Sequence, residues 1–286
     1  MNLLTEINLP VLRPLPPQRA IGRLALSFRA GSPLAPTRIE QFYQEGCLKS
    51  RLPRPVEAGV CEAVLMNISG GIAGGDELAT SLTLGAHARA CIAGQAAERI
   101  YRALGHDPAR ISTRITVGQG AELDYLPQET ILFDGFRLHR TLEIDLAEDS
   151  RYLGVESLVF GRLAMGERLR TGMLRDRIAL RRNGKALLTD MLRLEGDVQG
   201  LLARKALANG AGAMATLIYA APDAAARLEP ARALLEGSPC EAGASLVHGV
   251  LLARLLAPSS ALLRAAVVKI LSLCRDGRAL PRVWQS

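Results

Sequence analysis

The sequence predicts a mainly β protein, built of stacked or meandering strand layers, with a few α-helices concentrated towards the C-terminus. Three observations favour this fold class. Short segments with apolar residues at every second position recur along most of the chain. Three of these segments belong to a weak internal repeat with a period of roughly thirty residues. Beyond Pro222, apolar residues become spaced by three and four positions, as is typical of helices.

The overall composition is that of a folded, globular chain. Of its 286 residues, 49% are hydrophobic and only 4% are aromatic, so the core has to be built from aliphatic side chains. We expect a single domain over residues 1–286. Residues 1–20 are rich in proline, and we expect them to form an N-terminal arm.

Two apolar segments mark the first part of the predicted β body. "IGRLALSFRA" alternates apolar and other residues and is predicted to be a strand. "CEAVLMNIS" is a second predicted strand, and it leads directly into the glycine-rich loop "GGIAGGD". We expect the next strand to begin at Leu78.

The repeat consists of three copies that begin at Leu82, Ile115 and Ile144. Each copy opens with two apolar residues that flank one other residue, which is the alternation of a strand. Gly85 and Gly118 follow the first two copies, where tight turns are needed. Stacked layers of a β-solenoid-like body and an ordinary meander or sandwich are both compatible with this pattern.

The later part of the chain contains one clear hairpin and two helical patterns. Asn183-Gly184 lies between alternating segments and predicts a two-residue hairpin turn. "DAAARLEPARALLEG" and "SLVHGVLLARLLAPSSALLRAAVVKILSLC" are predicted to be helical. Within the second segment, we expect Pro258 to end one helix, and Ser259 or Ser260 to cap the next.

Charge and cysteine content exclude several classes of protein. The net charge is +7, but basic and acidic residues are interleaved, so we expect no nucleic-acid partner. The five cysteines are odd in number and form no CxxC motif, which favours a reducing compartment. The N-terminus does not resemble a signal peptide, and no apolar stretch is long enough to span a bilayer. We therefore expect a cytoplasmic protein with no membrane partner.

The glycine-rich loop has three possible interpretations. It lacks the lysine of a phosphate-binding loop, and Asp76 would repel a phosphate. It offers only Asp76 and Glu77 to a metal ion, too few ligands for a calcium site. We therefore predict a structural loop in which the glycines adopt positive φ or admit a close backbone, while Asp76 accepts backbone hydrogen bonds. The glycines concerned are Gly70, Gly71, Gly74 and Gly75.

Glu156 is the most conspicuous polar residue because it lies within the apolar segment "YLGVESLVFG". A buried carboxylate needs a partner. One interpretation is a structural ion pair with Arg162 or Arg175, and the other is a carboxylate that lines a polar passage. We predict no catalytic residue, and the spacing of the histidines and cysteines predicts no firm metal site. The chain also lacks the G-x-S-x-G motif of a serine-nucleophile elbow.

A long, ordered set of motifs resembles the urease accessory protein D family (UreD, also called UreH). The set comprises "YQEGCLKSRLPRP", "MNISGGIAGGDEL", "QAAERIYR", "LPQETILFDGFRLHRTLEIDL", "VESLVFGRLAMGE" and "LPRVWQS". The resemblance implies a mostly β fold of stacked strands with two helices. It also implies a cytosolic, non-catalytic chaperone that binds accessory protein F, the GTPase accessory protein G and apo-urease. Such proteins support GTP-dependent insertion of nickel, together with carbon dioxide modification of a urease lysine.

The resemblance also implies that nickel is a transient cargo, that no cofactor is tightly bound, and that nickel moves through an internal tunnel. A conduit should bind its ion loosely, and carboxylates bind nickel more weakly than imidazole or thiolate does. We therefore expect Glu156, with Glu129 or Glu167, to line such a path. Two alternatives stay open: a β-fold enzyme with an unrecognised carboxylate site, and a plain β-rich oligomerisation module.

Overall fold

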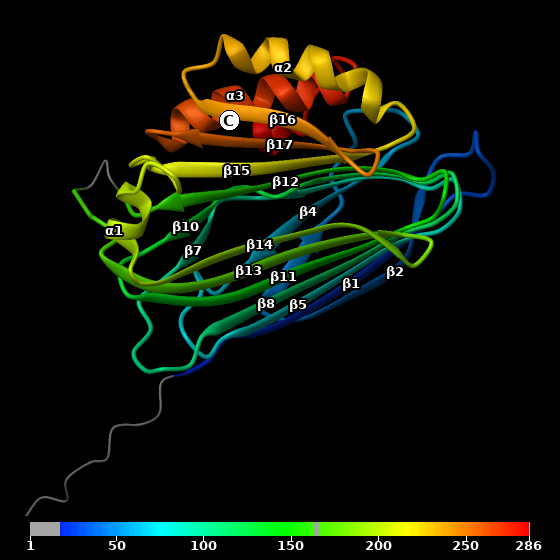
Figure 1. The fold of residues 1–286 in the computed structure, drawn as a ribbon. Coiled ribbons are helices and arrows are strands. Elements are labelled where there is room, and N and C mark those ends of the chain that lie inside the picture. Colours follow the sequence, from blue (N-terminus) through cyan, green and yellow to red (C-terminus); the bar gives the residue numbers. More distant parts are fainter. Residues whose placement is uncertain (1–17, 163–165, 286) are drawn as a thin grey trace, which may run out of the picture.

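The computed structural model describes residues 18–162 and 166–285, and its strands form two facing sheets (Figure 1). Residues 1–17 of the expected N-terminal arm lie outside the described residues. Residues 18–20 lead into the first strand, and the Ala20 N–H donates a hydrogen bond to Asp76 Oδ1 at 2.8 Å. The described chain is therefore fixed to the glycine-rich loop immediately before its first strand.

Sheet A has seven strands in the described chain, in the order β14-β13-β11-β8-β5-β1-β2. Its five inner strands run parallel to one another, and the two edge strands are antiparallel to their neighbours. The strands are β1 (Ile21–Arg29), β2 (Arg38–Gly46), β5 (Glu77–Leu84), β8 (Ala109–Val117), β11 (Phe136–Leu146), β13 (Thr171–Arg182) and β14 (Lys185–Asp197).

Sheet B has ten described strands, eight of them in the order β16-β17-β15-β12-β9-β6-β4-β3, while β10 pairs with both β12 and β7. Strands β4, β6, β9 and β12 are parallel neighbours. The strands are β3 (Leu48–Arg51), β4 (Cys61–Asn67), β6 (Arg89–Gly94), β7 (Glu98–Ile100), β9 (Glu122–Leu126), β10 (Thr130–Leu132), β12 (Arg151–Phe160), β15 (Ala213–Ala220), β16 (Glu241–Val247) and β17 (Val250–Ala257).

The internal repeat forms successive coils of a solenoid-like body. Each copy supplies one strand to sheet A and the next strand to sheet B: β5 with β6, β8 with β9, and β11 with β12. Leu82 pairs with Ile115, which pairs with Ile144, so the sequence alignment of the copies is also their hydrogen-bonded register. The turns stack too, because the Gly118 N–H donates to the Leu84 carbonyl at 2.9 Å. The prediction of stacked β layers is confirmed.

Three α-helices and two 3-10 helices complete the described chain. Helix α1 (Val198–Ala203) connects β14 to β15, and η2 (Ala224–Arg227) precedes α2 (Leu228–Glu236). Helix α3 (Ser260–Cys274) begins after Ser259, whose side chain accepts a hydrogen bond from the Leu262 N–H. The segment η3 (Arg282–Trp284) lies near the C-terminus. No described helix is both long and apolar enough to cross a membrane.

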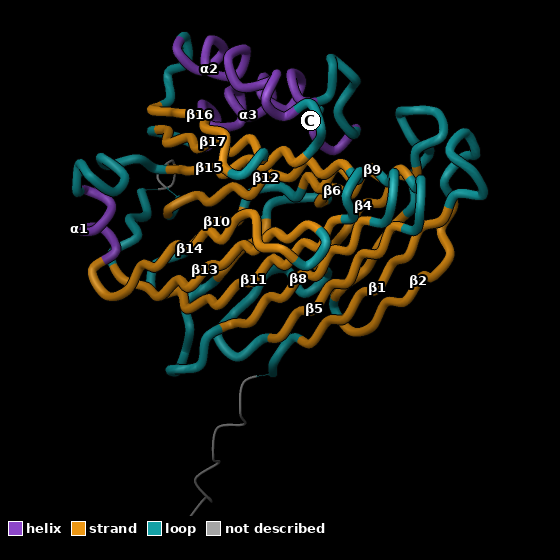
Figure 2. Tube along the Cα trace, turned by 45° about the vertical axis from the view of Figure 1, so that its right-hand side comes forward, coloured by secondary structure: helices purple, strands orange, loops and turns teal. Residues whose placement is uncertain are grey.

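Helices α2 and α3 cover the outer face of sheet B, over β15, β16 and β17 (Figures 1 and 2). They enclose a second core whose members include Leu217, Leu251, Val267 and Ile270. Among the described residues, no helix covers the outer face of sheet A. The two sheets therefore differ in their outer surroundings.

The prediction of a helix before Pro258 is wrong, because this segment is the hairpin of β16 and β17. His248 and Gly249 have φ of 47° and 79°, and Val247 pairs with Val250 across this two-residue turn. Strand β17 is buried on both faces, between the sheets and beneath the helices, so it is apolar almost throughout. Such a run cannot be distinguished from a buried helix by periodicity. The Asn183-Gly184 hairpin between β13 and β14 is confirmed, with φ of 47° and 75°.

Candidate functional site

The glycine-rich loop connects β4 to β5 beside a cavity between the two sheets. Gly70, Gly71 and Gly75 have φ of 80°, 147° and 90°, values that residues with side chains rarely adopt. Gly74 has ordinary φ, but an added Cβ would lie 2.5 Å from the Asp107 carbonyl oxygen. Strained backbone and close packing thus both favour glycine in this loop.

Asp76 anchors the loop at its end. Its side chain is 4% exposed. Its two carboxylate oxygens accept hydrogen bonds from the N–H groups of Ala20 and Ala73, each at 2.8 Å. Because both acceptors belong to one rigid group, the carboxylate links the loop to the start of β1.

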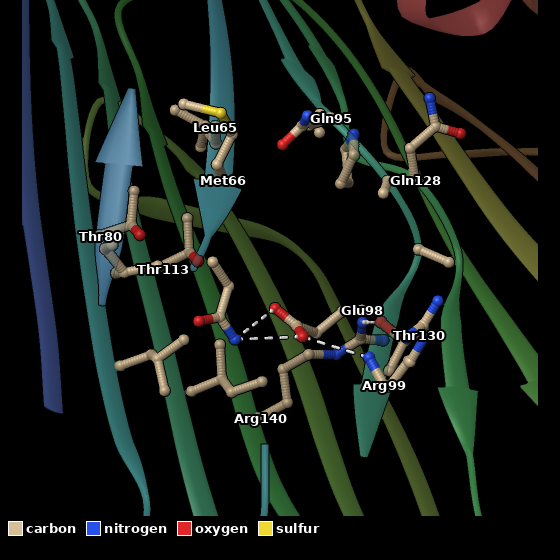
Figure 3. A pocket seen from close by; sticks show the side chains of 18 of the residues that line it. Leu65, Met66, Thr80, Gln95, Glu98, Arg99, Thr113, Gln128, Thr130 and Arg140 are labelled. Carbon is tan, nitrogen blue, oxygen red and sulfur yellow. Dashed lines mark hydrogen bonds between the residues drawn. The ribbon is translucent and has the colours of Figure 1, made fainter. Parts of the chain in front are cut away.

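A cavity of about 310 Å³ lies between the sheets next to this loop (Figure 3). Gly70 and Gly71 contribute to its wall, as do threonines from β5 and β8, and side chains from the connections after β6 and β9. Arg140 on β11 and Glu156 on β12 also line it. The side chains labelled around the cavity in Figure 3 are Leu65, Met66, Thr80, Gln95, Glu98, Arg99, Thr113, Gln128, Thr130 and Arg140.

Glu98 is a half-buried carboxylate in the wall of this cavity. The Asn67 side-chain amide donates to both of its oxygens at 3.2 Å, and the Arg99 N–H donates at 3.1 Å. Burial raises the pKa of Glu98, and these hydrogen bonds and the Arg99 charge only partly oppose that effect.

Arg140, Glu156 and Asp176 form a charged cluster that joins the two sheets at the cavity wall. Arg140 Nε and Nη2 donate to the Asp176 oxygens at 3.0 and 2.5 Å. Arg140 Nη1 donates to Glu156 Oε2 at 2.7 Å, and to Thr130 Oγ1 at 3.3 Å. The guanidinium therefore forms a bidentate pair with sheet A and a single charged contact with sheet B.

The electrostatics of this cluster follow from burial and from one unbalanced charge. Burial opposes the charged form of Arg140, but Asp176 and Glu156 outweigh it and raise the pKa of the guanidinium. Burial raises the pKa of Glu156, with Arg140 lowering it and Asp176 raising it further. One cation faces two carboxylates here, and the net effect is a pKa of Glu156 above its ordinary value.

Polar groups continue beyond this cluster towards the opposite side of the sheets. Arg140, Glu156 and Asp176 also line a second, smaller hollow, which reaches Asp190 on β14. Asp190 accepts a hydrogen bond from Arg254 on β17 at 2.5 Å. The inner faces of the sheets thus carry a row of polar side chains. The row extends from the cavity, through the charged cluster, to the contact between Asp190 on β14 and Arg254 on β17.

The structure separates the three glutamates that the sequence suggested for a common path. Only Glu156 lies at the cavity between the sheets. Glu129 lies 3.8 Å from Arg264, in a hollow that α3 and Trp284 also line. Glu167 pairs with Arg162 at 2.7 Å. The expected pairing of Glu156 with Arg162 or Arg175 is also wrong, because Arg140 is its partner.

Sequence reasoning missed Arg140 and Asp176, although a signal for them exists. Arg140 lies between Leu138 and Leu142, in the inward phase of the β11 alternation, and Asp176 has the corresponding place on β13. When each of two strands has a charged residue, of opposite sign, at a position whose side chain points into the protein, the pattern predicts an internal ion pair. That the two residues are opposite each other follows only from the register of β11 with β13.

No group of three or more His, Cys, Asp or Glu side chains within residues 18–162 and 166–285 is arranged to hold a metal ion. The five cysteines are free, and four of them are buried. Burial raises the pKa of Cys91 and Cys274, which keeps these thiols protonated and poor metal ligands.

The fold and the site define a two-sheet, solenoid-like β protein that has a carboxylate-bearing cavity between its sheets. A family model described as UreD urease accessory protein matches residues 20–285. The chain belongs to this family.

Several curated relatives are similar to the chain over nearly its whole length. A urease accessory protein UreD from Azorhizobium caulinodans is 45% identical over 93% of this chain and 97% of its own. One from Rhizobium leguminosarum bv. viciae is 44% identical over 94% and 96%. A urease accessory protein UreD 2 from Methylorubrum populi is 47% identical over 96% and 93%.

Proposed function

We propose that this protein is a non-catalytic, cytoplasmic chaperone of urease maturation, which conducts nickel between its two sheets. It acts with accessory proteins F and G, docks on apo-urease and supports GTP-dependent insertion of nickel. Family membership supports the accessory role. The single observation that carries the conduit is the cavity of about 310 Å³ that ends at the buried Arg140–Glu156–Asp176 cluster.

The chemistry of the lining suits an ion that is passed on. The cavity offers the carboxylates of Glu98 and Glu156, with the hydroxyls of Thr80 and Thr113. Oxygen ligands bind nickel more weakly than imidazole or thiolate ligands do. An ion that enters therefore exchanges between partners and is not trapped.

Arg140 controls access to Glu156 in this proposal. The guanidinium contacts Glu156 through one nitrogen but holds Asp176 through two. Breaking the single contact frees the Glu156 carboxylate for a cation, while Arg140 keeps its bidentate partner. The desolvation cost of an unpaired guanidinium is thereby avoided.

The division of labour among the partners follows from the motifs of the chain. The glycine-rich loop lacks the lysine of a phosphate-binding loop, so the GTPase activity is assigned to accessory protein G. Arg140 occupies both Glu156 and Asp176, which disfavours the alternative of a β-fold enzyme whose site would use these two carboxylates.

The test is the nickel content and activity of urease produced with a full set of structural and accessory genes. We expect the omission of this chain to give inactive, nickel-poor urease at normal abundance. We expect Glu156→Ala to fold and to bind its partners, since Arg140 would retain Asp176 as its partner. The same variant should lower the nickel content of urease at least about tenfold.

Glu129→Ala is the matched control, because it removes the same carboxylate beside an arginine on the opposite side of sheet B. It should leave nickel content unchanged. If omission of the chain lowers nickel content but Glu156→Ala does not, the conduit is wrong and the accessory role remains. If omission has no effect, the accessory role is wrong as well.

A further inference from the structure

The outer face of sheet A contains a groove that no described helix covers. A hollow of about 450 Å³ extends over β1, β5, β8 and β11. Its floor consists of the small residues Ala79, Ser112 and Thr141, which are neighbours in one hydrogen-bonded row. Because these side chains are short, another chain can approach the sheet closely. We call this hollow the outer groove.

A row of basic residues lies beside this floor. Arg110 is opposite His139, His139 is opposite Arg175, and Arg175 is opposite Arg193 on four adjacent strands. Adjacent strands are about 4.8 Å apart, and like charges at opposite positions destabilise a sheet. An arrangement that is unfavourable for the isolated sheet becomes favourable when an anion binds it.

Neither of the two arginines next to His139 forms a close ion pair in the described chain, although Glu195 lies within electrostatic reach of Arg175. In the part of the chain that the structure describes, neither Arg110 nor Arg175 forms an ion pair with a carboxylate, whereas Arg193 is paired with Glu195 at 2.6 Å. Other basic residues of this face, such as Arg114, are also paired. Within the described part of this row, Arg110 and Arg175 are thus the arginines that form no ion pair, and they lie on either side of His139.

His139 supplies a third, independent indication. Its Nδ1 lies 3.5 Å from Arg110 Nη1. A guanidinium can only donate, so Nδ1 is the acceptor and the neutral ring carries its hydrogen on Nε2. This Nε2 is buried and has no hydrogen-bond partner among the described residues. The imidazole between the two arginines is thus neutral, and the described chain offers its Nε2–H no acceptor.

The charges around His139 agree with this assignment. Burial, followed by Arg175 on β13, Arg110 on β8 and Arg137 on its own strand, lowers the pKa of His139. Glu77 on β5 is opposite Arg110, one strand beyond. A carboxylate brought to His139 would offset the three arginines and raise that pKa.

We propose that the outer groove binds an acidic segment of a protein partner, with carboxylates held by Arg110 and Arg175 on either side of His139. A protein fits better than a nucleic acid for two reasons. Glu77 and Glu195 flank the basic row and would repel a phosphodiester chain, whereas a protein can place basic residues there. Among the residues that the structure describes, the groove is lined by no tryptophan, tyrosine or phenylalanine on which bases could stack. This inference does not depend on the nickel conduit.

The test measures binding of a fluorescent peptide, in which a central run of glutamates is flanked by lysines, to the full-length protein by anisotropy, at fixed ionic strength. The variant Arg110→Glu/Arg175→Glu should weaken binding at least about tenfold, since two close charge contacts become repulsive. The control Arg29→Glu/Arg181→Glu changes the net charge equally on the same sheet and should alter the affinity less than about twofold. The peptide should also raise the pKa of His139, measured by NMR of the imidazole.

Three results would overturn the proposal. Equal weakening by both double variants would mean that the peptide responds only to net charge. An unchanged His139 pKa in the presence of bound peptide would place the peptide elsewhere. A DNA oligonucleotide of the same length that displaces the peptide and binds more tightly would make the ligand a nucleic acid. Thermal unfolding of each variant, compared with the parent protein, establishes that the fold is intact.

Discussion

Along the same strands of sheet A, one stretch of the inner face is aliphatic and the next is polar. In the aliphatic stretch, Leu82, Ile115 and Ile144 form one row, each at most 1% exposed. Two positions earlier on β5 and β8, Thr80 pairs with Thr113 at the cavity wall.

The polar stretch becomes charged two positions further along, where Ile111 pairs with Arg140, and Arg140 with Asp176. The side chains of all these residues point towards the facing sheet. The comparison shows that inward direction alone does not make a residue part of a dry core. Position along each coil decides whether it packs against aliphatic neighbours or lines a polar cavity.

The largest expected effect is in the polar stretch. Arg140→Met leaves Glu156 and Asp176 buried without their shared cation, which should lower the free energy of unfolding by about 3–5 kcal/mol. Urea denaturation measures this change. Arg177→Met is the control: its side chain is 37% exposed on the outer face, and it should cost at most about 0.5 kcal/mol. Equal losses would mean that the buried cluster contributes no more than a surface pair.

A smaller effect is expected in the aliphatic stretch. Ile115→Val removes one methylene from a fully packed row and should lower the free energy of unfolding by about 0.5–1.5 kcal/mol. Thr113→Val, two positions away at the cavity, keeps the side-chain volume but removes the hydroxyl that hydrogen-bonds the buried Tyr125, and should cost about 1–3 kcal/mol. If Thr113→Val costs less than Ile115→Val in the same denaturation assay, this hydrogen bond adds nothing to stability at the cavity wall.

The smallest effect is a pH dependence. The pKa of Glu156 is raised in the folded protein above its ordinary value of 4.5, so the folded state binds this proton more tightly than the unfolded state does. The stabilising contribution is complete below pH 4.5 and is lost as pH rises through the folded pKa.

Glu156→Gln does not titrate and should lack this loss. As pH rises above 4.5, the unfolding free energy of the parent protein should therefore fall relative to that of Glu156→Gln. The difference should then become constant. Denaturant unfolding at a series of pH values measures it. A difference that changes in the opposite direction would mean that Arg140 outweighs burial at this carboxylate.

Local patterns predicted a large part of this fold. The alternation of β1, the Asn183-Gly184 turn and the alignment of the three repeat copies were all readable, because they depend on neighbours in sequence. The hairpin of β16 and β17 was not, because burial on both faces removed the alternation that identifies a strand.

The candidate site was only partly predictable. Glu156 was conspicuous among apolar neighbours. Its partner Arg140 is sixteen residues away and belongs to the facing sheet, a distance in sequence at which no local pattern identifies a contact.

The sequence by itself determined the class of fold, the coil length and the residues that face inwards, since strand periodicity and turn chemistry are local properties. Only the tertiary structure decided which inward charges meet and where the cavity opens. It also decided that Arg110, His139 and Arg175 become neighbours on the outer face. The physical reason is that these contacts depend on strand register and on the packing of one sheet against the other, which arise only when distant coils stack.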